Sequence, residues 1–172
     1  APMNFGFSEE QEFLRTTARE FLAKESPMTA VRALMDDPRG YTPDVWAKMA
    51  ELGWLGLLLP EEYGGADLSV VDLIVVAEEL GRALTPSPFF ANLQGSLAVL
   101  HGGTDAQRKE ILPEVASGRR VLSFAITEES GTENADEIAT RATRSGSGWT
   151  LSGTKLFVPD GQSADAIVVA SV

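Results

Sequence analysis

The residues whose types and spacing could perform chemistry lie in a polar stretch at positions 127–131 (TEESG), directly after a short apolar alternation. From Leu122 to Ile126, apolar side chains alternate with small or polar ones, which predicts a strand with one apolar face. The adjacent carboxylates of Glu128 and Glu129 could serve as a general acid and a general base. Because nothing apolar flanks them to raise a pKa, we favour a solvated turn over a catalytic pair.

Other familiar kinds of site are poorly supported by the sequence. The chain has no cysteine, so disulfides and thiolate metal sites are excluded. His101 is the one histidine; its place at a predicted helix end favours a C-terminal capping role over catalysis, and no serine has a histidine partner at useful spacing. No Gly-x-Gly-x-x-Gly motif follows a strand. Asp36 and Asp37 lack further oxygen ligands at calcium-loop spacing, so we predict no metal site.

Charge and composition exclude several classes of protein. The 172 residues carry a formal net charge of -11 and no basic cluster, which argues against a nucleic-acid surface because nothing would neutralise phosphates. Apolar residues make up 44% and charged residues 23%, as in ordinary globular proteins. No apolar run approaches the ~18 residues of a membrane span, and the N-terminus lacks a secretory signal. We therefore expect a cytoplasmic protein without a membrane span.

Helix-start patterns and helical periodicity fill the chain from residue 8 to residue 117. Three of the helix starts carry a capping box. In this pattern the side chain three positions after the capping residue accepts a hydrogen bond from the backbone N of the capping residue. These pairs are Ser8 with Gln11, Ser69 with Asp72, and Thr104 with Gln107. Pro43 at a first helical position after Thr42 marks another start, and Gly53 is placed to end that helix. The helix after Ser69 is apolar almost all round, so we expect it at the centre of a bundle.

After Gly118 the dominant period changes from that of helices to that of strands. Short strands are predicted near residues 122–126, 138–144, 149–151, 154–158 and 166–172. The fold class is therefore α+β, with a helical bundle domain at 1–118 and an incomplete β domain at 119–172. These few strands would leave unpaired edges, so we expect further chain material to complete the sheet.

The order and spacing of several motifs resemble the flavin-dependent acyl-CoA dehydrogenases. The motifs are FAITEES (124–130), GWTLSGTKLFVPDG (148–161) and ADAIVVAS (164–171), preceded by WLGL (54–57), PEEYGG (60–65), EELG (78–81) and Leu-Pro (112–113). The resemblance covers nearly the whole chain. It implies an N-terminal all-α bundle followed by the first strands of an antiparallel, β-barrel-like middle domain. The C-terminal helical domain of the family is absent from this chain.

That resemblance implies an enzyme that uses FAD. Family members remove a proton from the α-carbon of an acyl-CoA thioester, pass hydride from the β-carbon to flavin N5, and deliver electrons to an electron-transfer flavoprotein-type acceptor. They are commonly homo- or hetero-oligomers. The catalytic base of the family lies in the C-terminal domain, so no residue here is assigned as catalytic. We expect the chain alone to be inactive and to bind flavin weakly.

The resemblance also implies roles for particular residues. The cofactor-binding positions are Phe124, Ile126 and Thr127 at the first strand end, and Phe157, Val158 and Pro159 against the flavin ring. The substrate-binding positions are Phe90 and Gln94 in the acyl-pocket wall, and Thr132 and Glu133 in the loop that contacts CoA. The residues alone leave structural alternatives open. Thr127 could simply end a strand, Phe157 could be sheet core, and Phe90 and Gln94 could be bundle core.

The sequence departs from the family pattern at three places, and two of them, Pro159 and the loop after Thr127, motivate the alternative of a partner subunit. Phe157 stands where tryptophan is usual, and Pro159 stands where a threonine hydroxyl usually bonds the flavin; proline offers no donor. Residues 129–134 replace the usual Pro-Gly-Ala-Gly-Ser-Asp loop, and Glu133 would repel a phosphate. The alternatives are a non-catalytic partner subunit of a hetero-oligomeric acyl-CoA dehydrogenase, or a relative that is an acyl-CoA oxidase or flavin monooxygenase. Acyl chain length, branching and steroid character are left open.

Overall fold

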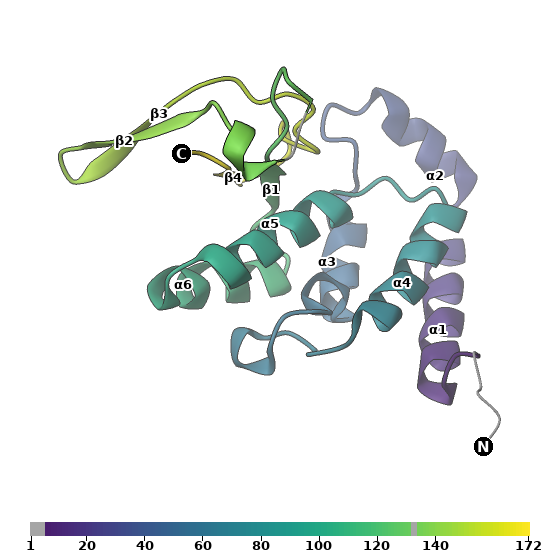
Figure 1. The fold of residues 1–172 in the computed structure, drawn as a ribbon. Helices are drawn as coiled ribbons and strands as arrows, with labels where there is room; N and C mark the ends of the chain where they lie inside the picture. Colours follow the sequence, from purple (N-terminus) through teal and green to yellow (C-terminus); the bar gives the residue numbers. More distant parts are fainter. Residues whose placement is uncertain (1–5, 132–133) are drawn as a thin grey trace. The chain divides into compact units, whose positions relative to one another are not determined.

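The computed structural model describes residues 6–131 and 134–172, which form two compact units (Figure 1). The first unit comprises the chain up to Ser87 together with Ala116–Gly118; the second comprises Pro88–Val115 together with Arg119–Val172. These units describe packing, and the division into domains at residue 118 stays a prediction. Within the described ranges, every helix is too short or too polar to span a bilayer.

The first unit is built from helices, several of which begin where the capping patterns predict. They are α1 (Glu9–Glu25), α2 (Met28–Ala33), η1 (Leu34–Asp36), α3 (Pro43–Glu51), η2 (Trp54–Gly56), η3 (Glu61–Tyr63) and α4 (Val70–Arg82). At the start of α1, the Gln11 backbone N donates to Ser8 Oγ (3.2 Å) and the Ser8 backbone N donates to Gln11 Oε1 (3.0 Å). Gly53 ends α3 in the left-handed region, at φ 76°, as predicted.

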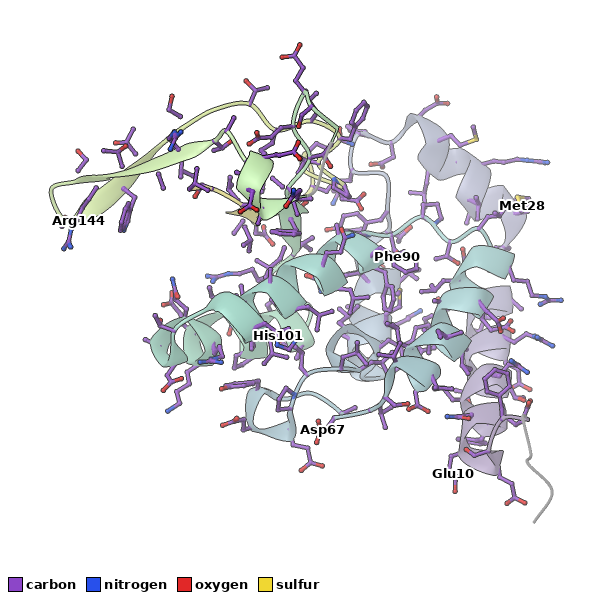
Figure 2. All side chains as sticks on the ribbon, in the orientation of Figure 1. Glu10, Met28, Asp67, Phe90, His101 and Arg144 are labelled. Carbon is purple, nitrogen blue, oxygen red and sulfur yellow. The ribbon has the colours of Figure 1, made fainter. Side chains whose placement is uncertain are left out.

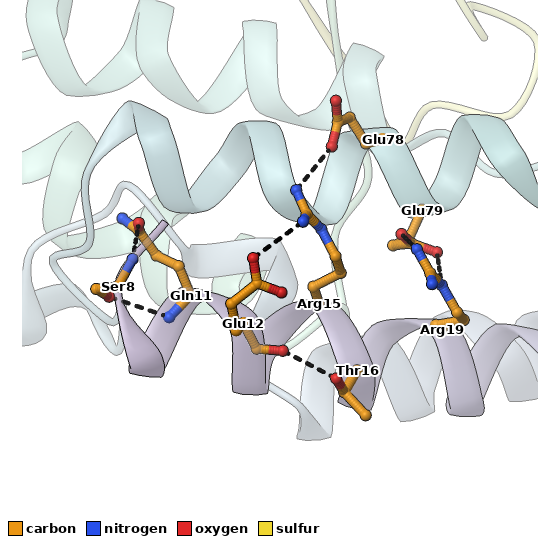
Figure 3. Close-up of polar contacts among 8 residues, drawn as sticks. All are labelled: Ser8, Gln11, Glu12, Arg15, Thr16, Arg19, Glu78 and Glu79. Atoms are coloured by element: carbon orange, nitrogen blue, oxygen red, sulfur yellow. Dashed lines mark hydrogen bonds and ion pairs between the residues drawn. The ribbon is translucent and has the colours of Figure 1, made fainter. Parts of the chain in front are cut away.

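A row of polar contacts joins α1 to α4 (Figure 3). Arg19 donates through Nε and Nη2 to the two carboxylate oxygens of Glu79, at 3.0 and 2.6 Å. Glu79 is only 3% exposed, and the bonds from Arg19 hold the pKa of its carboxyl below the ordinary value. Because a buried carboxylate is costly unless paired, this contact fixes how the two helices align.

The prediction that α4 lies at the centre of a helical bundle, buried on all sides, is wrong. Val75, Val76 and Leu80 are buried, but Val70 is 60% exposed and Ile74 is 47% exposed. The helix therefore buries one side, which includes its contact with α1, and leaves apolar residues of another side in the open. The all-round apolar pattern predicts what the helix could bury, whereas burial depends on which elements pack against it.

The second unit combines two helices with short strands. Its elements are α5 (Phe89–Gly102), α6 (Asp105–Ala116), β1 (Leu122–Ala125), η4 (Ala135–Glu137), β2 (Arg141–Ser145), β3 (Gly148–Ser152) and β4 (Ala166–Val169). β1 pairs with β4 in parallel, with Leu122 opposite Ala166 and Ala125 opposite Val169. β2 and β3 form the antiparallel hairpin drawn in green in Figure 1.

The predicted fold class is confirmed, with helices first and the opening strands of the middle domain after them. The described strands make two separate two-stranded sheets, one of them parallel, and they do not close a barrel. The strand predicted at 154–158 is wrong, because this segment forms no ladder. Phe157 has φ 51°, which interrupts the extended backbone that a strand requires.

Close packing of α5 on β1 positions the strand that leads into the site. The buried Asn92 side chain accepts a hydrogen bond from the Leu122 backbone N at 2.9 Å. A Cβ added at Gly95 would lie 2.6 Å from the Leu122 Cβ, so this helix position has no room for a side chain. The glycine therefore lets α5 approach β1 closely.

Gly95→Ala is therefore expected to lower the free energy of unfolding by about 1–3 kcal/mol, because the added methyl forces α5 away from β1. Gly102→Ala on the same helix is the matched control, since nothing lies within 4 Å of a Cβ there. We expect that control to be neutral or stabilising by up to about 1 kcal/mol. Urea unfolding followed by circular dichroism measures both, and equal effects would contradict the close-packing account.

Candidate functional site

The predicted cofactor-binding residues at the end of β1 lie next to the second predicted segment. Phe124 belongs to β1, while Ile126 and Thr127 follow it, and all three are partly buried. The Thr127 carbonyl accepts a hydrogen bond from the Leu156 backbone N at 2.9 Å. The Ile126 carbonyl accepts one from Lys155 Nζ at 3.0 Å. These bonds bring residues 126–127 beside the segment that carries Phe157, Val158 and Pro159.

Phe157 and its neighbours form an irregular, anchored segment. The Phe157 side chain is 87% exposed, so the sheet-core alternative for this residue is wrong. Val158 is half-buried and Pro159 is exposed. The fully buried Ser123 of β1 donates from Oγ to the Pro159 carbonyl at 2.5 Å. The segment is therefore tied to the β1 region on both sides of Phe157.

Glu128 is the most heavily bonded side chain near these residues. Its carboxylate accepts hydrogen bonds from the backbone N of Ala139 (2.7 Å), the backbone N and Oγ1 of Thr140 (2.9 and 2.6 Å) and Lys155 Nζ (2.7 Å). The side chains of Glu128 and Lys155 are 9% and 8% exposed. The solvated turn predicted for Glu128 is therefore wrong, whereas Glu129 is exposed as predicted.

This environment makes Glu128 a fixed anion. Lys155 first, and then Thr140 and the two backbone donors, lower the pKa of the Glu128 carboxyl from 4.5 to about 2. A general acid or base works best with a pKa near the operating pH, so this carboxylate is unsuited to proton transfer. Its chemistry is electrostatic and structural: it neutralises Lys155 and gathers donors from two other segments of the second unit.

Residues 8–119 match the N-terminal domain of the acyl-CoA dehydrogenases, well over half of the chain. The chain belongs to the acyl-CoA dehydrogenase family. It is 35% identical to acyl-CoA dehydrogenase FadE12 of Mycobacterium tuberculosis over 167 residues, which are 94% of this chain and 42% of that protein. The chain thus spans less than half the length of this curated relative.

Two solved structures share the fold of this chain. One is an acyl-CoA dehydrogenase of Bacillus anthracis complexed with FAD, with TM-score 0.79 and 28% identity, covering 95% of this chain and 28% of that one. The other is the ChsE4-ChsE5 complex of Mycobacterium tuberculosis, with TM-score 0.83 and 25% identity, covering 96% of this chain and 44% of that one.

The residues expected to bind substrate in this acyl-CoA dehydrogenase family member lie partly on α5. Phe90, labelled in Figure 2, is 54% exposed and packs edge-to-face on the buried Phe89. Gln94 lies one turn further along and is exposed, so bundle core is wrong for both residues. Thr132 and Glu133 lie outside the described residues. In the part of the chain that the structure describes, no group of three or more His, Cys, Asp or Glu could hold a metal ion.

The roles of Lys155 and Thr140 were missed by the sequence reasoning. Lys155 lies 27 positions from Glu128, and Thr140 lies 12 positions away. Neither spacing is a helix or hairpin period, so no local signal links them. The one hint in the sequence is a lysine directly before the apolar run Leu156 to Val158. A lysine there has to reach water or find a partner.

The low pKa of Glu128 predicts how stability changes with pH. Folding favours the charged form, so the stabilisation is complete above the ordinary pKa of 4.5 and is lost as the pH falls through about 2. We expect Glu128→Gln to be less stable than the parent chain at pH 7. As the pH falls from 4.5 to 2, the free energy of unfolding of the variant should decrease less steeply than that of the parent chain. The difference in slope should correspond to the binding of up to about one proton.

The matched control for this experiment is Glu129→Gln, the same change at the adjacent exposed residue. Denaturant unfolding at pH 7, 5, 4, 3 and 2 gives the free energy of unfolding for all three chains. The control should keep the pH slope of the parent chain. A parental slope in Glu128→Gln as well would contradict the ion-pair geometry described for Glu128.

Proposed function

We propose that this chain supplies the N-terminal helices and first middle-domain strands of an FAD-dependent acyl-CoA dehydrogenase. The reaction proposed for the whole protein that contains it is α,β-dehydrogenation of an acyl-CoA thioester. Membership of the family supports the reaction class. One observation carries the assignment of the site: the bond from Leu156 N to Thr127 O, which places the strand end beside Phe157–Pro159.

The arrangement fits a flavin. A planar isoalloxazine ring needs an aromatic or apolar surface against one face and polar groups along its pyrimidine edge. The exposed Phe157 side chain offers the surface, and the Thr127 hydroxyl with the backbone of Phe124 and Ile126 offers the polar groups. Val158 and Pro159 would complete the wall. When bound, FAD would accept the hydride, and the FAD complex of a 28% identical relative supports this cofactor.

The proposed substrate contacts lie on α5 and in the loop after Glu128. Phe90 and Gln94 share one exposed side of α5, which suits contact with an acyl chain. Thr132 and Glu133 are proposed to meet the CoA portion. We assign no catalytic base in this chain, because the resemblance places the base of the family in the C-terminal domain and Glu128 is held as an anion by Lys155.

We also propose an electron acceptor, an oligomeric state and a cellular location for the whole protein. Electrons would pass to an electron-transfer flavoprotein-type acceptor, as the family resemblance implies. A homo- or hetero-oligomer is proposed, and the structural similarity to the ChsE4-ChsE5 complex supports it. A cytoplasmic location is proposed from the absence of cysteine in the composition.

The direct test is the absorption spectrum of the whole protein, recorded before and after a panel of acyl-CoA thioesters is added without oxygen. We expect a flavin band that bleaches with at least one thioester, which would also identify the acyl class. Fast reoxidation by oxygen would indicate an oxidase. A protein that stays colourless after FAD and a homologous partner are supplied would favour a non-catalytic partner subunit.

Pro159→Thr tests the proposed ring-facing segment by adding the hydroxyl that the parent residue lacks. We expect FAD affinity to rise roughly two- to tenfold, the value of one net hydrogen bond. Pro159→Ala is the control, since it removes the proline ring without adding a donor. Fluorescence titration of the whole protein with FAD measures all three. Equal affinity in the threonine and alanine variants would count against flavin contact at this position.

A further inference from the structure

We propose that Glu128 and Lys155 form a positioning pair that sets the separation of Thr127 and Phe157, and thereby shapes the flavin site. The inference rests on the proposed function, because it assigns to a buried ion pair the task of holding the two flavin-facing segments together. Neither side chain is a catalytic residue in this account. Both act through the neighbours that they hold in place.

Few bonds hold the segment at 154–159 in place. It forms no strand ladder, and one backbone hydrogen bond, from Leu156 N to Thr127 O, joins it to residues 126–128 in the described structure. A single backbone bond leaves such a segment free to pivot. The remaining connections come from side chains: Lys155 on one side of Phe157, and Ser123 bonded to the Pro159 carbonyl on the other.

The pair of Glu128 and Lys155 links this segment to the residues around Thr127. Lys155 Nζ bonds both the Ile126 carbonyl (3.0 Å) and Glu128 Oε1 (2.7 Å), so it spans the residues on either side of Thr127. Glu128 is in turn held by Ala139 and Thr140. With both charged side chains less than a tenth exposed, water competes poorly for these bonds. The ammonium group of Lys155 therefore holds the Lys155 backbone at a fixed distance from Thr127.

Phe157, two residues after Lys155, has a strained backbone. A phenylalanine at φ 51° occupies the left-handed region, which costs free energy for any residue with a side chain. Such a conformation persists only where the surrounding structure imposes it. The phenyl group is 87% exposed, so its own packing does not impose the conformation. The anchors at Lys155, Leu156 and Pro159 do, and they present the ring outward.

The test compares the whole protein with a double variant, Glu128→Gln with Lys155→Met, which removes both charges and leaves no unpaired buried ion. We expect FAD affinity to fall by about tenfold and the visible flavin band to shift, because the ring contacts lose their fixed spacing. Lys155→Arg, which keeps the cation, should recover part of the affinity. If the double variant lost FAD affinity only because the whole fold was destabilised, keeping the cation at position 155 would not recover it.

Glu114→Gln is the matched control. The Glu114 carboxylate is also held by a cation of the second unit, with Arg119 Nε and Nη2 at 2.9 and 2.7 Å, and both residues lie outside the segments 123–128 and 154–159. The control should keep parental affinity and spectrum. Hydrogen exchange at the Leu156 amide provides a second measurement that needs no flavin, and we expect faster exchange only in the double variant.

The outcomes separate this inference from the proposed function. If the parent protein binds FAD and the double variant binds it equally tightly with an unshifted band, the positioning role is overturned and the proposed function stands. If the parent protein binds no flavin, the proposed function is overturned. In that case, hydrogen exchange at the Leu156 amide tests whether Glu128 and Lys155 link the two segments. Faster exchange in the double variant would support that link, and unchanged exchange would overturn it.

Discussion

A buried carboxylate with four hydrogen-bond donors governs the described site. Glu128 draws together the segment after β1, the backbone at Ala139 and Thr140, and Lys155. Each of these groups belongs to a stretch with little regular secondary structure of its own. An ionised side chain shielded from water must keep its partners, since an unpaired buried charge costs several kcal/mol. The requirement of one anion therefore imposes order on three stretches of irregular chain.

The first unit uses the same device for a different purpose. Glu79 is buried and bonded through both oxygens by Arg19, and there the pair joins two regular helices, α1 and α4. Removing that pair would weaken a helix contact, whereas removing the pair at Glu128 would release the segment that presents Phe157. Ion pairs with a buried carboxylate thus carry different functional weight, although the Arg19 side chain is 49% exposed whereas Lys155 is 8% exposed. The difference depends on whether the joined elements are already ordered by backbone bonds.

Local features of the fold could be predicted from the sequence, because their causes are local. The helix starts at Ser8 and Thr104 depend on a bond to a side chain three positions later, which the sequence displays directly. The change to strand periodicity after Gly118 also placed strands close to those of β1, β2, β3 and β4. The parallel pairing of β1 with β4 joins residues 44 positions apart at Leu122 and Ala166, and the sequence carries no sign of it.

The site was predicted in part for the same reason. The resemblance placed Thr127 and Phe157 in one site, and the structure brings their segments together. The environment of Glu128 could not be predicted, because its surroundings depend on Lys155 and Thr140, which the fold brings in from elsewhere. Phe157 is exposed rather than core because its left-handed backbone breaks the strand that alternation suggests.

A crystal structure of the whole protein with FAD bound would show directly whether Glu128 and Lys155 hold the two segments of the flavin site together. We expect the isoalloxazine ring against the Phe157 side chain, its pyrimidine edge at Thr127, and the bond between Glu128 and Lys155 intact. A flavin bound elsewhere, with Phe157 still open to solvent, would contradict this expectation.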